Sequence, residues 1–224
     1  MAKRIRLGAL ISGGGTNLQA IIDACESDRI DAEVVFVGSD TPQAAGLERA
    51  RRHAIPVFVV DYRAVAHSFR QAPGAAELPP DFRLDEIRAQ QGLLAKNADP
   101  TRLDEFLKIR AIAEAALLAA MQPFSFDLLV LAGFMRNLTP YFIDRVNADR
   151  AVPRIMNIHP ALLPAFPGTD GYGDTLRYGC KVAGCTVHFV DYGEDSGPVI
   201  GQRAFAIHAD DTIEAVRKRG LEQE

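Results

Sequence analysis

The fold class is indicated by the first regular stretch of the chain, Ile5-Arg-Leu-Gly-Ala-Leu-Ile-Ser-Gly-Gly-Gly-Thr-Asn17. Its apolar run over residues 5–11 predicts a buried strand. Residues 17–24, with apolar side chains at positions 18, 21 and 22, predict a helix. The three glycines between them permit positive φ angles and leave backbone N–H groups uncovered. A strand, a glycine loop and a helix in this order are typical of an α/β fold.

The same alternation continues along the chain. Short apolar runs at 34–37, 56–60 and 128–132 predict further strands, and helical patterns fall at 46–53 and 102–121. The run at 128–132 is too short and too apolar for a surface helix, so it predicts a central strand that is buried on both faces. Strands that alternate with helices predict βαβ units and a mostly parallel sheet.

The C-terminal third of the chain has a different pattern. Residues 185–190 and 199–205 both read as strands, and only the turn-forming residues 191–198 join them. Consecutive strands on so short a connection pair antiparallel. The sequence therefore predicts an α/β fold whose mostly parallel central sheet has an antiparallel portion in its C-terminal part.

A length of 224 residues suits one domain. A surface insertion at about 62–109 is indicated, because this stretch holds four prolines and lacks apolar alternation in its first part. We therefore expect a single domain over 1–224, with an N-terminal half at about 1–125 and a C-terminal half at about 126–224. The sequence ends at Glu224 inside an amphipathic stretch without a capping glycine, so we expect it to be truncated.

The composition argues against several classes of protein. Hydrophobic residues make up 48% of the chain and charged residues 24%, and no apolar run approaches the roughly 18 residues that a membrane span needs. The formal net charge of −4 argues against a general nucleic-acid binder. Cys25, Cys180 and Cys185 form neither a disulfide framework nor a zinc-binding pattern. We expect a cytoplasmic protein with reduced thiols, no metal, and no nucleic-acid or membrane partner.

The glycine loop at 12–17 can hold a phosphate, because a helix N-terminus carries a partial positive charge and uncovered N–H groups. Thr16 and Asn17 can each cap the helix or bind a phosphate oxygen. A dinucleotide fingerprint would need its third glycine where Leu18 stands, and a Walker loop would need a Lys-Ser/Thr ending. A monophosphate site fits best, and a tight turn without a ligand is the alternative.

Two further segments carry chemically useful side chains. Asn157 and His159 are two positions apart in an apolar stretch, so an extended backbone would present an amide and an imidazole to one volume. Asp195 lies in the following turn, where Asp191 and Glu194 are competing carboxylates. A buried structural histidine and an aspartate that bonds its own turn are the alternatives for these residues.

Four segments in this order resemble phosphoribosylglycinamide formyltransferase. They are 12–22, 131–136, 157–164 and 187–200, and the resemblance covers about 1–60 and 110–224. The resemblance implies a formyltransferase-type Rossmann-like fold. It also implies that the amine of 5-phosphoribosylglycinamide takes the formyl group of 10-formyltetrahydrofolate, an early step of purine (IMP) biosynthesis. Both substrates are small molecules, and we expect a monomer or homodimer that uses no metal.

The resemblance also implies roles for individual residues. Asn157, His159 and Asp195, here called the catalytic trio, match the family's catalytic residues. Asn157 and a protonated His159 would stabilise the oxyanion, while Asp195 would raise the imidazole pKa and help relay the amine proton through water. The other matches are substrate contacts: Gly15, Thr16 and Asn17 for the ribonucleotide phosphate, Glu224 for its ribose, and Arg110, Met135, Arg136, Asn137, Leu138 and Asn157 for the folate.

Two segments depart from the family pattern. The insertion at about 62–109 is longer than the usual connection, and residues 168–174 replace a loop that usually contains a histidine. Three other functions stay open. Methionyl-tRNA formyltransferase usually lacks this glycine loop and carries a basic C-terminal domain, and formyltetrahydrofolate hydrolase usually has a regulatory domain before the loop. A non-catalytic nucleotide-binding module would use the loop and leave the trio as structural residues.

Overall fold

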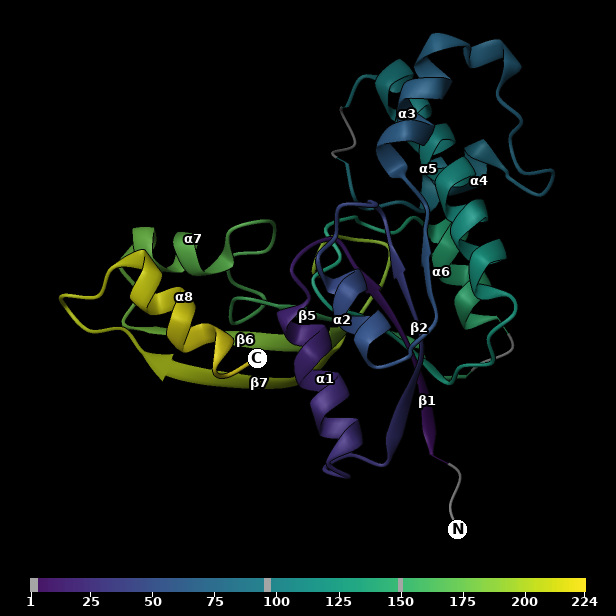
Figure 1. Ribbon diagram of the computed structural model, residues 1–224. Helices are drawn as coiled ribbons and strands as arrows, with labels where there is room; N and C mark the ends of the chain where they lie inside the picture. Colours follow the sequence, from purple (N-terminus) through teal and green to yellow (C-terminus); the bar gives the residue numbers. More distant parts are fainter. Residues whose placement is uncertain (1–3, 95–97, 149–150) are drawn as a thin grey trace. The chain divides into compact units, whose positions relative to one another are not determined.

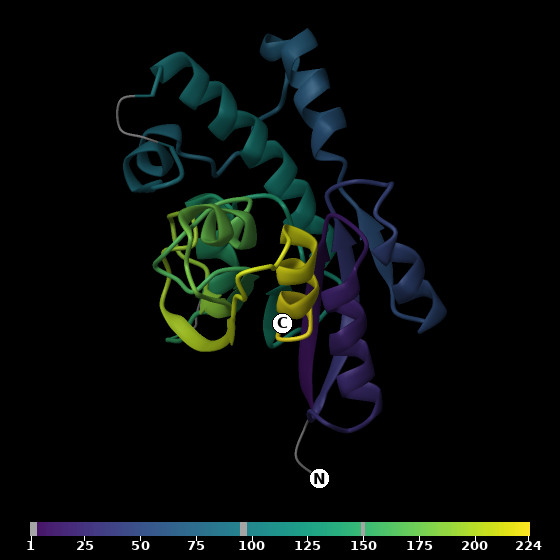
Figure 2. The ribbon, with the colours of Figure 1, turned by 90° about the vertical axis from the view of Figure 1, so that its left-hand side faces the viewer.

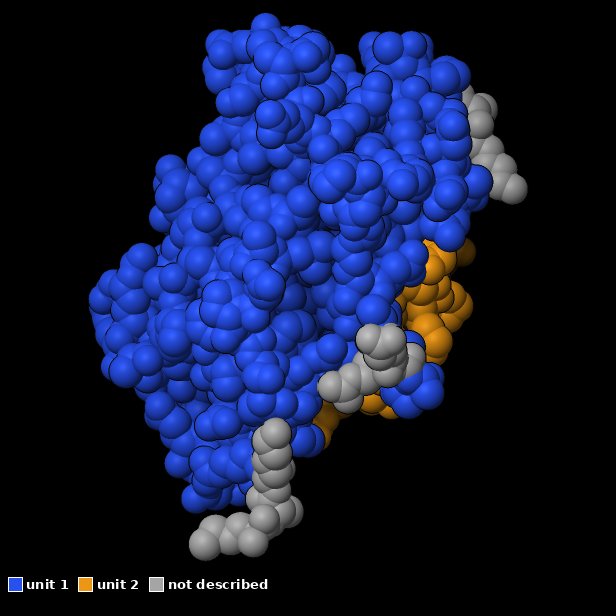
Figure 3. Space-filling view, turned by 90° about the vertical axis from the view of Figure 1, so that its right-hand side faces the viewer, with its two compact units in different colours: residues 1–155 blue, residues 156–224 orange. Residues whose placement is uncertain are grey.

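A computed structural model of the protein describes residues 4–94, 98–148 and 151–224 (Figure 1). The chain divides into two compact units, which we call unit 1 (Met1–Ile155) and unit 2 (Met156–Glu224); Figure 3 colours them blue and orange. Among the described residues, no helix is both long enough and apolar enough to cross a membrane.

Unit 1 contains a parallel sheet. Its strands are β1 (Ile5–Ile11), β2 (Ala32–Ser39), β3 (Val57–Val59) and β4 (Leu128–Leu131). They lie in the order β3-β2-β1-β4. Leu7 of β1 pairs with Val34 of β2 on one side and with Leu128 of β4 on the other. Leu10 and Phe36 are fully buried, so the predicted strands are also the centre of the core.

Helices cover both faces of this sheet (Figures 1 and 2). They are α1 (Thr16–Glu26) and α2 (Gly46–Arg52) on one face, and α5 (Pro100–Met121) and α6 (Pro140–Asn147) on the other. Leu18 and Ile22 of α1 pack against Ile11 of β1, which follows the spacing of a helix with one apolar face. Asp99 caps α5 by accepting a hydrogen bond from the N–H of Arg102. The predicted helix at this position is confirmed.

The segment expected as a surface insertion contains regular structure. Its elements are α3 (Tyr62–Gln71), a 3₁₀ turn at Pro73–Ala75 and α4 (Leu84–Gln90). Asp61 caps α3 by accepting from two backbone N–H groups. Phe82 and Ile87 pack against Leu107 of α5. The prolines that break the sequence pattern therefore separate short helices, and α4 shares a small apolar core with α5 and Tyr141 of α6.

Unit 2 is built on an antiparallel sheet. Its elements are β5 (Ile155–His159), α7 (Gly171–Tyr178), β6 (Val182–Phe189), β7 (Val199–Ala206) and α8 (Ile213–Leu221). β6 pairs antiparallel with both β5 and β7. Tyr172 of α7 and Val216 of α8 form a core with Ala183 of β6. The predicted fold class, a mostly parallel sheet with an antiparallel C-terminal portion, is confirmed.

Candidate active site

The catalytic trio comes together within unit 2. Asn157 and His159 lie two positions apart on β5, and alternate side chains of a strand point to the same face. Asp195 lies in the turn between β6 and β7, and its Oδ2 is 3.0 Å from His159 Nδ1. His159 is only 3% exposed. This contact is therefore shielded from water and only weakly screened by salt.

Both ring nitrogens of His159 face hydrogen-bond acceptors. Nδ1 faces the carboxylate of Asp195, and Nε2 is 2.8 Å from the carbonyl oxygen of Phe166. An imidazole with protons on both nitrogens can donate to both acceptors at once. The surroundings therefore hold the ring in one orientation and can satisfy both N–H groups of its cationic form.

Asp195 is held as a carboxylate in an uncommon backbone conformation. Its φ of 51° lies in the left-handed region, which few residues other than glycine adopt. Burial raises the pKa of this carboxyl, but the hydrogen bonds from His188 and the N–H of Gly168 and the charge of His159 outweigh burial, so the pKa lies below its ordinary value. The turn thus presents an ionised acceptor to His159, and backbone strain of this kind is concentrated at functional sites.

The structure distinguishes the carboxylates of this turn. Asp191 Oδ1 accepts from the N–H of Gly193 at 3.1 Å and from the hydroxyl of Ser196 at 2.6 Å. This pattern is that of an aspartate that shapes its own turn. Asp195 instead faces His159. The composition of the turn left the choice between these carboxylates open, and the geometry brings Asp195 to the imidazole.

His188, on β6, belongs to the same cluster. Its Nε2 is 3.5 Å from Asp195 Oδ1 and 3.3 Å from Asn157 Nδ2, and its Nδ1 donates to the carbonyl oxygen of Phe189. Burial lowers the pKa of this imidazole, but the hydrogen bond to Asp195 outweighs burial, and the net pKa is raised. The pairing register of β5 and β6 could have indicated that His188 lies in the site, because Asn157 lies directly opposite His188.

The glycine loop lies in unit 1, between β1 and α1. Gly15 has a φ of 72° and is the N-cap residue of α1, which begins at Thr16. The capping role that the sequence allowed for Thr16 is therefore not used, and its exposed side chain can contact a ligand. Arg49 Nε donates to the carbonyl oxygen of Gly14 at 2.8 Å, which adds a cation beside the loop. The arrangement suits an anion.

The predicted folate segment lies beside the same loop of unit 1. The N–H of Met135 donates to the hydroxyl of Ser12 at 2.8 Å, and Arg136 pairs with the buried Asp40 at 2.5 Å. The side chain of Met135 is 65% exposed, so it can contact a ligand directly. The side chain of Leu138 is in the core, so Leu138 can offer a ligand only its backbone.

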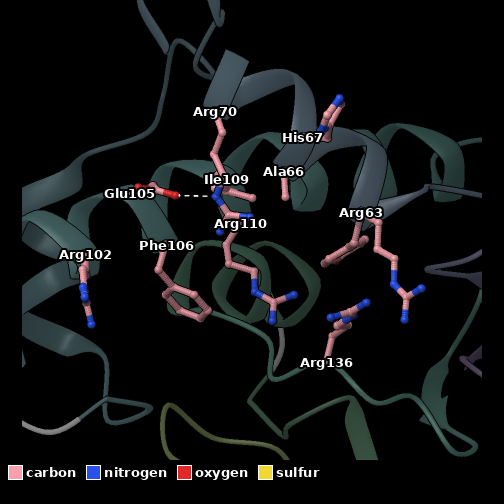
Figure 4. Close-up of a pocket in the computed structure, with 11 residues that line it drawn as sticks. Arg63, Ala66, His67, Arg70, Arg102, Glu105, Phe106, Ile109, Arg110 and Arg136 are labelled. Atoms are coloured by element: carbon pink, nitrogen blue, oxygen red, sulfur yellow. Dashed lines mark hydrogen bonds and ion pairs between the residues drawn. The ribbon is translucent and has the colours of Figure 1, made fainter. Parts of the chain in front are cut away.

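Arg110 and Arg136 both line a cavity of about 900 Å³ in unit 1, between α3 and α5 (Figure 4). The Arg110 guanidinium lies 5.2 Å from the ring centroid of Tyr62 and 5.1 Å from that of Phe106. Burial lowers the pKa of Arg110, but an arginine stays protonated at neutral pH. The cavity therefore offers fixed positive charge between aromatic walls.

Glu224 lies in unit 2. Its Oε1 accepts a hydrogen bond from the hydroxyl of Tyr172 at 2.8 Å. It lines a small cavity of about 260 Å³ together with Asp170 and Arg217. Glu224, the predicted ribose contact, is thus a carboxylate that a hydrogen bond from Tyr172 of α7 holds in place.

The predicted residues fall into separate groups. Unit 2 holds the trio and Glu224, whereas unit 1 holds the glycine loop, Arg110 and residues 135–138. Within the ranges that the structure describes, no group of three or more histidine, cysteine, aspartate or glutamate side chains has the arrangement of a metal site.

Comparisons with known proteins relate the chain to enzymes of one-carbon transfer. The family model described as formyl transferase matches residues 5–224. Phosphoribosylglycinamide formyltransferase of Mycobacterium tuberculosis is 36% identical over 214 residues, which are 96% of this chain and 77% of that protein. The trifunctional purine biosynthetic protein adenosine-3 of Bos taurus is 32% identical over 217 residues, and the chain spans only 17% of its length.

A solved structure agrees with these relatives. The crystal structure of glycinamide ribonucleotide transformylase 1 from Symbiobacterium toebii has a TM-score of 0.72 and 37% sequence identity, and the match covers 99% of this chain and 82% of that one. The family model and the relatives therefore agree on one assignment. The chain belongs to the formyl transferase family and, within it, to the phosphoribosylglycinamide formyltransferases.

Proposed function

We propose that this chain transfers the formyl group of 10-formyltetrahydrofolate to the amine of 5-phosphoribosylglycinamide, a step of purine biosynthesis. The single observation that carries the proposal is the buried contact of 3.0 Å between His159 and Asp195, beside the amide of Asn157. An amide donor, an imidazole and an ionised carboxylate are the groups that acyl transfer to an amine requires.

The trio divides the chemistry between its members. Attack of the amine on the formyl carbon develops an oxyanion, which the Asn157 amide would stabilise by donating an N–H hydrogen bond. His159 would supply positive charge beside this oxyanion. Asp195, which its low pKa keeps ionised, would help relay the proton that the amine releases through water, and the bond between the formyl carbon and the folate nitrogen breaks as that nitrogen takes up a proton and tetrahydrofolate leaves. Each of these roles is performed by a side chain that is already oriented before substrate binds.

The binding residues form the second part of the proposal. Gly15, Thr16 and Asn17 would hold the ribonucleotide phosphate, and Glu224 would hold its ribose. The loop supports this role through the start of α1 and through the cation of Arg49. The folate would contact Arg110, Met135, Arg136, Asn137, Leu138 and Asn157. We also propose that residues 1–224 act as a single formyltransferase domain in the cytoplasm, as a monomer or homodimer, without metal, nucleic acid or membrane.

Consumption of the formyl folate with and without the ribonucleotide tests this function. The protein is mixed with 10-formyltetrahydrofolate, and loss of the formyl group is followed in the presence and absence of 5-phosphoribosylglycinamide. Loss only with the ribonucleotide supports the proposal, whereas loss without it favours a hydrolase. No loss under either condition, with the protein shown to be folded by circular dichroism, favours a binding module. The His159→Ala variant is the matched control for catalysis at the trio.

A further inference from the structure

The segment at 168–174, which departs from the family pattern, contains the side chain that contacts Glu224. Tyr172, in the first turn of α7, is 5% exposed, and its hydroxyl donates to Oε1 of Glu224 at 2.8 Å. Its ring belongs to the core that Ala183 of β6 and Val216 of α8 form in unit 2. The core therefore fixes the position from which the hydroxyl reaches the carboxylate.

The end of α8 makes room for the ring of Tyr172. A Cβ at Gly220 would lie 2.5 Å from the Tyr172 hydroxyl and would overlap the ring itself, so any other residue at this position would displace the tyrosine. The carbonyl oxygen of Gly220 also accepts a hydrogen bond from the N–H of Glu224 at 3.1 Å. The glycine that accommodates the tyrosine thus also fixes the backbone of the glutamate that the tyrosine contacts.

Tyr172 is a permanent hydrogen-bond donor to Glu224. Burial and the negative charge of Glu224 raise the pKa of the Tyr172 phenol, so the hydroxyl stays protonated at neutral pH. A carboxylate has about four acceptor positions, so this bond does not prevent Glu224 from accepting others. Glu224 is half-buried and lines two small cavities, of about 260 Å³ and about 230 Å³. A ligand can therefore reach a carboxylate whose orientation is already set.

Such an orientation favours binding, because a glutamate side chain rotates about several bonds and loses this freedom when it binds a ligand. A side chain that is ordered beforehand loses less entropy on binding. We propose that Tyr172 is a positioning residue, which orients the carboxylate of Glu224 toward the ribose hydroxyls of 5-phosphoribosylglycinamide. This inference rests on the proposed function, in which Glu224 contacts that ribose, and it gives a role to the segment at 168–174.

Equilibrium binding of each substrate to Tyr172→Phe tests the inference. The variant removes only the hydroxyl and keeps the ring in the core. Calorimetry on the full chain should show that Kd for 5-phosphoribosylglycinamide rises about tenfold, as expected for a lost hydrogen bond to a charged group, while Kd for 10-formyltetrahydrofolate changes by less than about twofold. Retained folate binding also shows that the variant is folded. An unchanged Kd for the ribonucleotide, or an equal rise for both ligands, would overturn the proposal.

A double variant shows whether Tyr172 acts through Glu224. Glu224→Ala should itself weaken binding of the ribonucleotide by at least about tenfold, because it removes the proposed ribose acceptor. Tyr172→Phe/Glu224→Ala should then bind the ribonucleotide as weakly as Glu224→Ala alone, because the hydroxyl has no carboxylate left to orient. Losses that multiply in the double variant would contradict the positioning role. Unchanged binding by Glu224→Ala would contradict it as well.

Tyr178→Phe is the matched control. It removes the hydroxyl of a tyrosine at the other end of α7 that is 80% exposed. Both dissociation constants should stay within about twofold of the parent values, because surface substitutions have small effects. A tenfold loss of ribonucleotide binding in this control as well would show that the hydroxyl of Tyr172 has no specific role.

Steady-state kinetics separate this inference from the proposed function. Tyr172→Phe should raise KM for the ribonucleotide by about tenfold and leave kcat within about twofold, because the hydroxyl acts on binding of the ground state and the transition state alike. A fall in kcat with an unchanged KM would overturn the proposal. The absence of formyl transfer in the parent protein would refute the proposed function. Normal transfer in the parent, together with an unchanged Kd in Tyr172→Phe, would refute only the positioning role.

Discussion

Two carboxylates, the partly buried Asp195 in unit 2 and the fully buried Glu114 in unit 1, have opposite ionisation behaviour. Burial raises the pKa of Glu114 to about 7, although Thr139 donates two hydrogen bonds to it, from its N–H and its hydroxyl. The pKa of Asp195 lies below its ordinary value, because two imidazoles and the N–H of Gly168 face it. The side chain of Asp195 is 11% exposed and Glu114 is fully buried, so both carboxylates are largely withdrawn from water. The charge of the partners therefore decides whether a buried carboxylate is ionised.

Glu114 and Asp195 also differ in the parts of the molecule that they contact. Glu114 lies on α5, and its hydrogen bonds join this helix to the start of α6. No described cation makes an ion pair with it. Asp195 instead occupies a strained turn beside residues that are proposed to touch the substrate. The first carboxylate joins two helices, whereas the second is proposed to supply negative charge for formyl transfer.

Asp195→Asn should have the largest effect. Asparagine tolerates the left-handed backbone at this position, so the turn should keep its shape. The variant loses the negative charge beside His159, and we expect kcat to fall by about 10²–10³. Steady-state formyl transfer measures the loss, and circular dichroism checks the fold. Asp191→Asn is the matched control and should change kcat by less than about threefold, because an amide oxygen can still accept the bonds of the turn. Near-normal kcat in Asp195→Asn would remove Asp195 from the mechanism.

Glu114→Gln should increase stability at alkaline pH. The folded state keeps the proton of Glu114 up to about pH 7, whereas the unfolded chain releases it near the ordinary glutamate pKa of 4.5. The stabilising contribution is therefore complete below about pH 4.5 and is lost as the pH rises through 7. The variant avoids ionisation, so its free energy of unfolding at pH 8 should exceed that of the parent by about 2–3 kcal/mol.

Urea unfolding at pH 5 and pH 8 measures this effect. The gain of Glu114→Gln should be small at pH 5 and full at pH 8. Glu48→Gln removes an exposed carboxylate of α2 and serves as the control. The same pH dependence in the parent and in Glu114→Gln would mean that Glu114 titrates as an ordinary glutamate.

His188→Gln tests whether an imidazole partner keeps Asp195 ionised. The variant removes a cationic neighbour of Asp195 while a polar side chain of similar length remains. We expect kcat to fall by about tenfold with KM unchanged. The pKa of Asp195 should rise, so the acidic limb of the pH–rate profile should move to higher pH. His208→Gln, at an exposed position, is the control. A lower kcat without movement of the acidic limb would leave His188 a purely structural role.

Thr139→Val should have the smallest effect. It removes the hydroxyl that donates to Glu114 and keeps the shape of the side chain. We expect the free energy of unfolding to fall by about 1 kcal/mol, the usual loss for one buried hydrogen bond. Chemical unfolding at pH 8 measures the change, and Thr101→Val at an exposed position is the control. An unchanged free energy would show that the N–H of Thr139 is sufficient for Glu114.

Local patterns in the sequence predict most of the fold. The apolar run at 5–11 predicts a strand, and the apolar spacing at 102–121 predicts a helix. Both elements are present. α3 and α4 were not predicted, because their apolar faces are short and pack against other helices, α3 against α5 and α4 against α5 and α6. A helix whose stability comes from a distant partner leaves a weak pattern in its own residues.

The candidate site could be predicted only in part for a similar reason. Asn157 and His159 share a strand, so their spacing alone placed them on one face. The choice of Asp195 over Asp191 depends on turn geometry, and the position of His188 depends on the register between β5 and β6. The sequence does not predict the cavity lined by Arg110 and Arg136, because this cavity forms only where α3 packs near α5.

The contact between Gly15 and Gly46 limits how this protein can be engineered. A Cβ at Gly15 would lie 2.7 Å from the Cα of Gly46, and a Cβ at Gly46 would lie 2.6 Å from a methyl group of Ile11. The loop and the first turn of α2 therefore form one inseparable module. Grafting the loop into another scaffold requires the first turn of α2 as well. A library of random substitutions should leave Gly15 and Gly46 unchanged. A side chain at either position would clash with neighbouring atoms, and a change at the other position would not relieve the clash.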